Sequence, residues 1–268
     1  MTHTLDIPVD VTLSRDEILL IAALFERDGL IGLAADPIET QITPAGRGLM
    51  LVAAERSLRA RGFARLRERD ASLEVRRDVL GAVGLCAFAT RAAVVTGIDA
   101  QGSVAREAVY AAEGQFVCQS SPQPALYRLQ TGRSLAEASA TLTAALGLPT
   151  GVAGAVGPVC GLAAEALRTA REGAERGDAS AARMALTAAG MPEAEAAALV
   201  ALWGQPYRFV GVHRLVAQPT GEAQASAITY LFGQASLWRM VEDAQGAVQL
   251  CQVSAGAVQA EVAALLGA

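Results

Sequence analysis

The sequence predicts an α+β protein with an internal pseudo-twofold duplication, and three observations support this prediction. The stretch from Arg106 to Leu148 has the pattern of three short strands followed by one amphipathic helix. The same pattern returns from Ala225 to Gly267. In both halves, helical segments and a single strand come first. We therefore expect antiparallel sheet with two helical clusters, in which each half covers an apolar sheet face of the other.

The first half begins with a predicted strand at Leu5–Leu13, which Pro8 restricts to a sheet edge. Ser14 and Glu17 then form a capping box for a helix that is expected to stop at Gly29. Pro37 and Pro44 mark the following segment as a loop. After this loop we expect a helix at Arg47–Phe63, a helix at Ser72–Phe88, a strand at Ala92–Ile98, a turn at Asp99–Ser103 and, after three strands, a helix at Ser134–Leu146.

The second half follows Gly147–Gly161, a segment rich in glycine and proline that we interpret as a linker. The predicted domains are therefore residues 1–149 and 150–268, packed together as one unit. In order, the second half is expected to contain helices at Leu162–Arg176, Ser180–Ala189 and Glu193–Trp203, a strand at Tyr207–Val216, a turn at Pro219–Gly221, three strands and a helix at Ala255–Leu266.

Local sequence matches support the duplication. Leu58–Phe63 and Leu186–Met191 each end a helix at a glycine that an apolar residue follows. Thr141–Leu148 corresponds in the same way to Glu261–Ala268. The repeat is roughly 125 residues long, which is too long for a solenoid.

The composition indicates a folded protein. Of its 268 residues, 52% are hydrophobic and 18% are charged, which excludes a disordered chain. Much of the hydrophobicity is alanine, and apolar runs such as 18–25 are far shorter than the ~20 residues that span a bilayer. The N-terminus lacks the pattern of a secretory signal. We predict a soluble cytoplasmic protein without a membrane span.

No set of residues indicates catalysis, so we predict no catalytic, cofactor-binding or metal-binding residues and no enzyme activity. The histidines are His3, near the terminus, and His213, which is expected to be structural. The sequence has neither a P-loop nor a G-x-S-x-G motif. The four cysteines, Cys86, Cys118, Cys160 and Cys251, lack C-x-x-C spacing, so a zinc or redox motif is not expected. Cys118 and Cys251 lie in apolar strand patterns, where we expect free, buried thiols.

One basic block stands out. It contains eight arginines, at positions 56, 59, 61, 65, 67, 69, 76 and 77. Two helices joined at this block are compatible with a winged helix that binds DNA. The simpler interpretation is a solvated face with ion pairs, such as Glu55 with Arg59. The net charge of −5 also argues against nucleic acid as the main partner.

The two tryptophans are predicted to be structural. Trp203 ends a helix just before Pro206, so we expect it to pack at the junction with the next strand. Trp238 lies within a predicted strand and is expected in the core, although an exposed position there would indicate an interface.

Several segments together resemble the EspG family of cytosolic chaperones in ESX (type VII) secretion. The resemblance spans nearly the whole chain and rests on Thr12–Leu24, Leu58–Phe63, Glu107–Gln119, Leu146–Pro149, Ala181–Met191 and Ala264–Gly267. It implies a pseudo-twofold arrangement of antiparallel sheet and two helical clusters, and a helical secreted protein or heterodimer as the partner. It carries over no residue-level substrate motif.

Two function hypotheses follow. The first is a non-enzymatic cytosolic binding protein that holds a helical, apolar partner, with the loops Gly97–Arg106 and Gln218–Gln224 as the expected contacts. The alternative is a winged-helix-containing transcriptional regulator with a ligand-sensing second half, in which Arg76 and Arg77 would contact DNA. An enzyme of unfamiliar type is the least favoured class.

Overall fold

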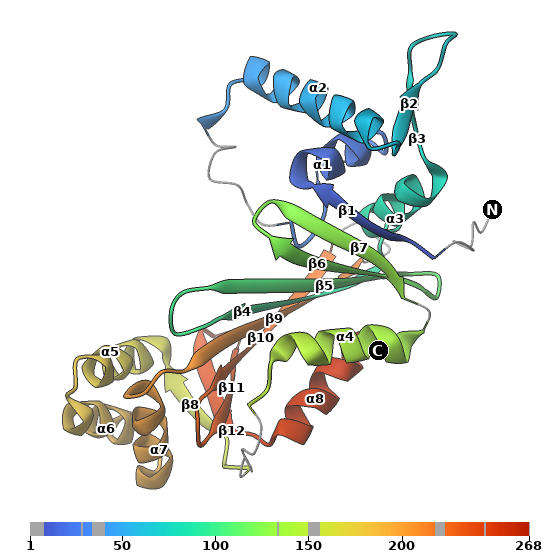
Figure 1. Ribbon diagram of the computed structural model, residues 1–268. Helices are drawn as coiled ribbons and strands as arrows, with labels where there is room; N and C mark the ends of the chain where they lie inside the picture. Colours follow the sequence, from blue (N-terminus) through green and yellow to red (C-terminus); the bar gives the residue numbers. More distant parts are fainter. Residues whose placement is uncertain are drawn as a thin grey trace. The chain divides into compact units, whose positions relative to one another are not determined.

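The computed structural model describes residues 8–27, 29–33, 41–132, 134–149, 156–217, 223–243 and 245–267. The helices are α1 (Arg15–Ala23), α2 (Pro44–Ala60), α3 (Arg77–Ala87), α4 (Leu135–Leu146), α5 (Ala164–Glu175), α6 (Ala179–Ala188), α7 (Glu193–Trp203) and α8 (Ala255–Ala264). The strands are β1 (Asp10–Ser14), β2 (Ala64–Leu66), β3 (Leu73–Val75), β4 (Arg91–Ile98), β5 (Val104–Ala112), β6 (Gln115–Gln123), β7 (Leu126–Gly132), β8 (Cys160–Ala163), β9 (Arg208–Ala217), β10 (Ala223–Phe232), β11 (Leu237–Glu242) and β12 (Ala247–Gln252). The predicted α+β class is confirmed (Figure 1).

Ten strands form one large sheet in the order β1-β7-β6-β5-β4-β9-β10-β11-β12-β8, and β2 pairs with β3 in a separate hairpin. Counted from either edge, a short strand is followed by four strands in reverse chain order. β5, β6 and β7 form an antiparallel meander. Its first turn, Glu113-Gly114, has φ values of 50° and 80°, which suit a tight hairpin turn. The strand order agrees with the predicted repeat, while the duplication itself stays a prediction.

The chain divides into two compact units, and each takes in three separate stretches of sequence. Unit 1 comprises Met1–Val94, Glu107–Thr141 and Leu215–Gln224. Unit 2 comprises Val95–Arg106, Leu142–Arg214 and Ala225–Ala268. The long strands β4, β5, β9 and β10 contribute to both units, as does α4. The division into domains of residues 1–149 and 150–268, which the sequence suggested, stays a prediction.

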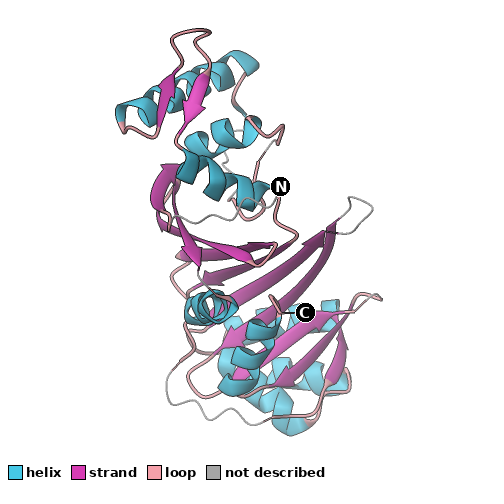
Figure 2. Ribbon diagram, turned by 90° about the vertical axis from the view of Figure 1, so that its right-hand side faces the viewer, coloured by secondary structure: helices cyan, strands magenta, loops and turns pink. Residues whose placement is uncertain are grey.

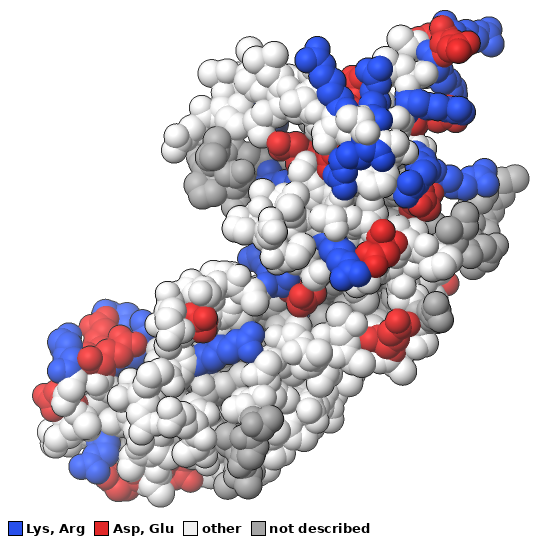
Figure 3. Space-filling view, viewed as in Figure 1, with Lys and Arg blue, Asp and Glu red and all other residues white. Residues whose placement is uncertain are grey.

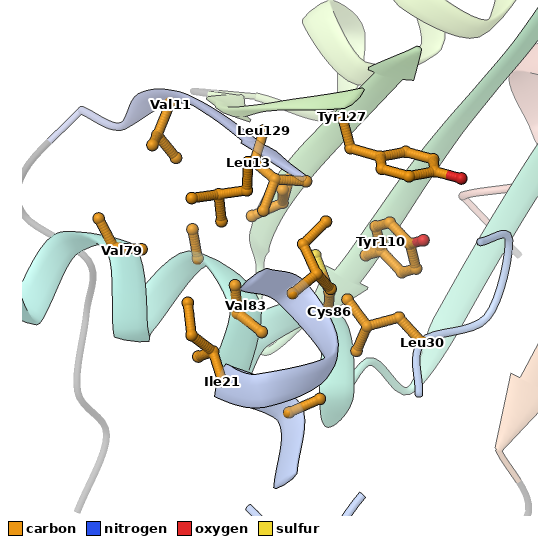
Figure 4. Close-up of a cluster of buried hydrophobic side chains, with 14 of the residues drawn as sticks. Val11, Leu13, Ile21, Leu30, Val79, Val83, Cys86, Tyr110, Tyr127 and Leu129 are labelled. Atoms are coloured by element: carbon orange, nitrogen blue, oxygen red, sulfur yellow. The ribbon is translucent and has the colours of Figure 1, made fainter. Parts of the chain in front are cut away.

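The core of unit 1 lies between its strands and the helices α1 and α3. Figure 4 shows Leu13 and Leu129 from β1 and β7 pointing toward Ile21 of α1 and Val83 of α3. These side chains are fully buried. The predicted capping box starts α1, because Ser14 N–H donates to Glu17 Oε2 (2.7 Å) and Glu17 N–H donates to Ser14 Oγ (3.2 Å). The register β1–β7 places the N-terminal strand at the sheet edge, as Pro8 predicted.

Several predicted bounds in unit 1 are wrong. Helix α1 ends at Ala23 rather than near Gly29, and Pro44 is the first residue of α2 rather than part of a loop, a position that suits its fixed φ. The helix expected from Ser72 begins only at Arg77, because Leu73–Val75 pairs with Ala64–Leu66 as strand β3. The hairpin β2–β3 therefore separates the helices that were expected to form a winged helix, and Figure 2 shows it beside α2. Pro37 lies outside the described residues.

Unit 2 packs helices on both faces of its strands. Leu231 and Trp238 belong to the buried cluster formed with α5, α6 and α7. The neighbouring Tyr230 and Arg239 point the other way, since both bind Glu261 of α8. The core position predicted for Trp238 is confirmed, as is the helix Glu193–Trp203. Trp203 is buried in the same cluster, against which Tyr207, just before the next strand, packs. The predicted helix at Leu162 begins at Ala164, after the unpredicted strand β8.

Candidate protein-binding surface

Arg208 at the start of β9 shows which sheet face is covered in this part of unit 2. Its guanidinium donates to the carbonyl oxygens of Leu146 (2.7 Å), Gly147 (3.3 Å) and Ala145 (3.3 Å), at the C-terminal end of α4. These carbonyls have no partners within the helix, and a cation there also compensates the helix dipole. Alternate residues of β9, starting at Arg208, therefore lie on the side of α4.

Phe209 and His213 consequently lie on the opposite face of β9. Both side chains are exposed, with 37% of Phe209 accessible, whereas Val210 and Val212 between them are buried. The space above Gly211 is occupied by these two rings, because an added Cβ would lie 3.5 Å from His213 and 3.8 Å from Phe209. The strand predicted at Tyr207–Val216 is thus confirmed as β9, and its face with Phe209 and His213 is exposed.

The neighbouring strands β4 and β5 extend this face. A Cβ on Gly97 would lie 2.3 Å from the guanidinium of Arg208, so Gly97 faces α4 and its neighbours Thr96 and Ile98 face away. Arg106 Nε lies 3.4 Å from Thr96 Oγ1, which places Arg106 on the same side.

The side chains on this side of β4, β5 and β9 form a surface in unit 2 that we call the open strand face. Alternation along β5 adds Val104, whose side chain is 62% accessible. All of these residues belong to the same compact unit. The open strand face is formed by Thr96, Ile98, Val104, Arg106, Phe209 and His213.

The turn between β4 and β5 is held by its own hydrogen bonds. Asp99 Oδ1 accepts from the N–H groups of Gln101 (2.9 Å) and Ser103 (2.8 Å). The N–H of Gly102, at a φ of 81°, donates to the carbonyl oxygen of Asp99 (3.0 Å). The predicted turn at Asp99–Ser103 is therefore confirmed, and it fixes the strand ends that carry Ile98 and Val104.

The residues considered for chemistry do not meet. His213 is exposed, so it is not part of the core, and the described residues contain no group of histidines, cysteines and acids that could hold a metal ion. All four cysteines are free. Three are buried, but Cys251, which was expected to be buried, is partly accessible. Of the two predicted contact loops, Gly97–Arg106 contributes Ile98, Val104 and Arg106 to the open strand face, while most of Gln218–Gln224 lies outside the described residues.

Burial raises the pKa of one carboxyl group in unit 1 well above its usual range. Glu107 lies on β5, and its burial raises the pKa of its carboxyl group to about 7. The same effect raises the pKa of the nearby Cys118 thiol. In unit 2, burial raises the pKa of the Tyr230 phenol, which donates to Glu261 Oε2 (2.7 Å). The hydrogen bond from Tyr230 to Glu261 links β10 to α8 within unit 2.

The fold and the open strand face place the chain in a structural class: an α+β protein with an apolar strand surface, of the kind that often binds proteins. No family model and no curated protein matches the sequence. A solved structure does match: the type VII secretion system chaperone EspG5 of Mycobacterium tuberculosis, in complex with the PE25–PPE41 dimer. The two chains share 15% identity, with a TM-score of 0.65 and 96% of each chain covered. The chain thus has the EspG-like fold that its sequence resemblance predicts.

The part of the chain that the structure describes has no helix long and apolar enough to cross a membrane.

Proposed function

We propose that this chain is a non-enzymatic, cytosolic chaperone of type VII secretion that binds a helical secreted protein or heterodimer. The observation that carries the proposal is the likeness over 96% of the chain to a chaperone whose structure contains a bound dimer. The open strand face is the surface in unit 2 that suits such a partner, because it combines apolar side chains with polar groups at its border.

The physical basis of binding would be burial of apolar surface. A helical tip placed over Phe209 removes its exposed ring, and Ile98 and Val104, from water, at ~25 cal/mol for each Å² buried. Aromatic and arginine side chains commonly supply the strongest contacts in such interfaces. At the border, the guanidinium of Arg106 can donate hydrogen bonds to polar groups of the partner, and the imidazole of His213 can also form hydrogen bonds. The rigid turn at Asp99–Ser103 limits the entropy lost on binding.

The test is co-purification with a helical heterodimer of the PE–PPE kind that is bound in the matching structure. The wild-type chain is expected to retain the heterodimer, and the double variant Ile98→Ser, Phe209→Ser is expected to weaken binding at least about tenfold. Met184→Ser is the matched control, because Met184 is 63% accessible and lies on α6 of the same unit, outside the open strand face. If Met184→Ser loses the heterodimer to the same extent, or if the double variant still retains it, the partner binds a surface other than the open strand face.

A further inference from the structure

A second surface with a different character lies in unit 1. It is an open groove of about 810 Å³ beside the end of α1, the hairpin β2–β3 and the start of α3. We call it the arginine–aromatic groove. Leu24 is 49% accessible there, far more than a leucine of the core. Its apolar lining consists of Leu24, Phe25, Phe63, Leu73, Val75 and Leu80.

Phe63 is held between two guanidinium groups. The guanidinium carbon of Arg61 lies 4.5 Å from the ring centroid, and that of Arg76 lies 4.8 Å from it. Asp78 fixes Arg76 through hydrogen bonds of 2.6 and 2.8 Å. The ring and both cations are thus ordered before any partner arrives, which lowers the entropy cost of binding.

The apolar surface continues beyond the groove with the same combination of residues. Phe88 is 51% accessible and makes an edge contact with Phe25, with 5.5 Å between the ring centroids. The guanidinium of Arg27 lies 5.1 Å from the centroid of Phe88. Exposed aromatic rings beside arginines are typical of the strong contacts in protein interfaces.

The charge of the groove is unbalanced. Its lining contains four arginines (Arg65, Arg67, Arg76 and Arg77) and one carboxylate, Glu74, which Arg65 neutralises at 2.8 Å. Arg67 and Arg77 are exposed. Figure 3 shows the basic side chains gathered over this end of unit 1, around α2 and the hairpin. A positive rim around an apolar floor is complementary to a segment that carries both carboxylates and large apolar side chains.

We propose that the arginine–aromatic groove is a docking site for an acidic amphipathic segment of a partner protein. Its apolar side chains cover Phe63 and Leu80, and its carboxylates bind Arg67 and Arg77. Nucleic acid fits less well, because a phosphate backbone would leave the apolar floor of the groove exposed. The site lies in unit 1, so it does not depend on the open strand face or on the proposed chaperone function.

The experiment uses the full chain and a synthetic amphipathic peptide of about 18 residues, with leucines on one face and glutamates on the other. Binding is measured by fluorescence anisotropy at about 50 mM salt, where charge attraction is weakly screened. Two control peptides replace the glutamates by lysines or the leucines by serines. The acidic leucine peptide is expected to bind at least about tenfold more tightly than either control.

The variant Arg67→Glu, Arg77→Glu should reduce binding of the acidic peptide at least about tenfold. Both side chains are exposed, and Arg77 is the first residue of α3, where a glutamate favours the helix. The matched control is Arg176→Glu, Arg183→Glu, which changes the net charge equally in unit 2 at exposed positions. Circular dichroism checks that both variants fold.

Three outcomes would overturn the proposal. One is equal loss of peptide binding in both arginine variants, since the attraction would then be nonspecific. Another is tight, salt-dependent binding of a duplex DNA that only Arg67→Glu, Arg77→Glu abolishes, because the groove would then bind nucleic acid. The third is a dimer of the free chain, seen by light scattering, that the same variant dissociates. A negative peptide result leaves co-purification of the helical heterodimer unaffected, so the two proposals fail separately.

Discussion

Glu17 is a fully buried carboxylate, and its neighbours explain how the fold accommodates the charge. It caps its own helix through the N–H of Ser14 and accepts hydrogen bonds from Arg61 Nη1 at 2.9 and 3.1 Å. Arg61 also donates to the carbonyl oxygen of Thr12. Arg61 thus connects the end of α2 to β1 and α1. Glu17, which the sequence predicted as part of a local capping box, also makes this long-range contact.

Arg61→Met is expected to destabilise the protein by about 1–3 kcal/mol, because the buried carboxylate loses its ion pair. The expected loss is below that of a fully buried pair, since 38% of the Arg61 side chain is accessible. Urea unfolding measures the change. Arg59→Met is the control: Arg59 is exposed and its partner Glu55 is partly accessible on the same helix, so the expected change is below about 0.5 kcal/mol.

Glu107 predicts a specific pH dependence. Its carboxyl pKa is about 7 in the folded chain and near 4.5 in the unfolded chain. Between these values the folded state binds more protons, so this residue makes stability fall as pH rises from 4.5 to 7. Glu107→Gln should therefore stabilise the protein at pH 8 by about 1–2 kcal/mol, after allowance for partial solvent screening.

The measurement for Glu107→Gln is urea unfolding at pH 5 and pH 8. The gain should be present at pH 8 and largely absent at pH 5. The exposed Glu68 in the β2–β3 turn provides the control, since Glu68→Gln should change stability little at either pH. An identical gain for Glu107→Gln at both pH values would refute the assigned acidity.

At the scale of elements, the end of α4 depends on two glycines. Gly147 has a φ of +56°, and a Cβ there would lie 1.8 Å from Arg208 Nη1. Gly97 on β4 leaves room for the other side of the same guanidinium. Arg208 can therefore bind the last carbonyls of α4 only because neither position carries a side chain.

Gly147→Ala should destabilise the protein by about 2–3 kcal/mol, combining left-handed backbone strain with loss of the Arg208 contact. Gly62→Ala is a matched control, because Gly62 has a φ of +71° but open space around it. Gly62→Ala is expected to lower the free energy of unfolding by about 1 kcal/mol, from the left-handed backbone strain alone. Equal thermal unfolding midpoints for the two variants would contradict the role assigned to Arg208.

Elements with strong local signals could be predicted from the sequence. The capping box at Ser14 and the helix Glu193–Trp203 depend on contacts within one helix, and both are confirmed. The strands β3 and β8 are three and four residues long. β3 forms by pairing with β2 in a hairpin, and β8 forms by pairing with the distant strand β12. Leu73–Val75 continues the apolar pattern of a helix, so periodicity alone favoured the wrong element.

At the scale of the whole molecule, the sequence predicted an α+β chain with an EspG-like fold, and the structure agrees. The binding surface could be predicted only in part. The alternation of β9 showed that Phe209 and His213 share a face, but which face stays open depends on where α4 ends. The end of α4 is bound by Arg208 through the carbonyl oxygen of Leu146, and these two residues are 62 positions apart in the sequence.

The most direct test of the central claim is site-specific photo-cross-linking on the complex with the helical heterodimer. A photoreactive phenylalanine analogue is placed at Phe209 in one sample and at Met184 in another. The account predicts that the probe at position 209 cross-links to the heterodimer and that the probe at position 184 does not. A cross-link from position 184 alone would show that the partner binds α6 and leaves the open strand face uncovered.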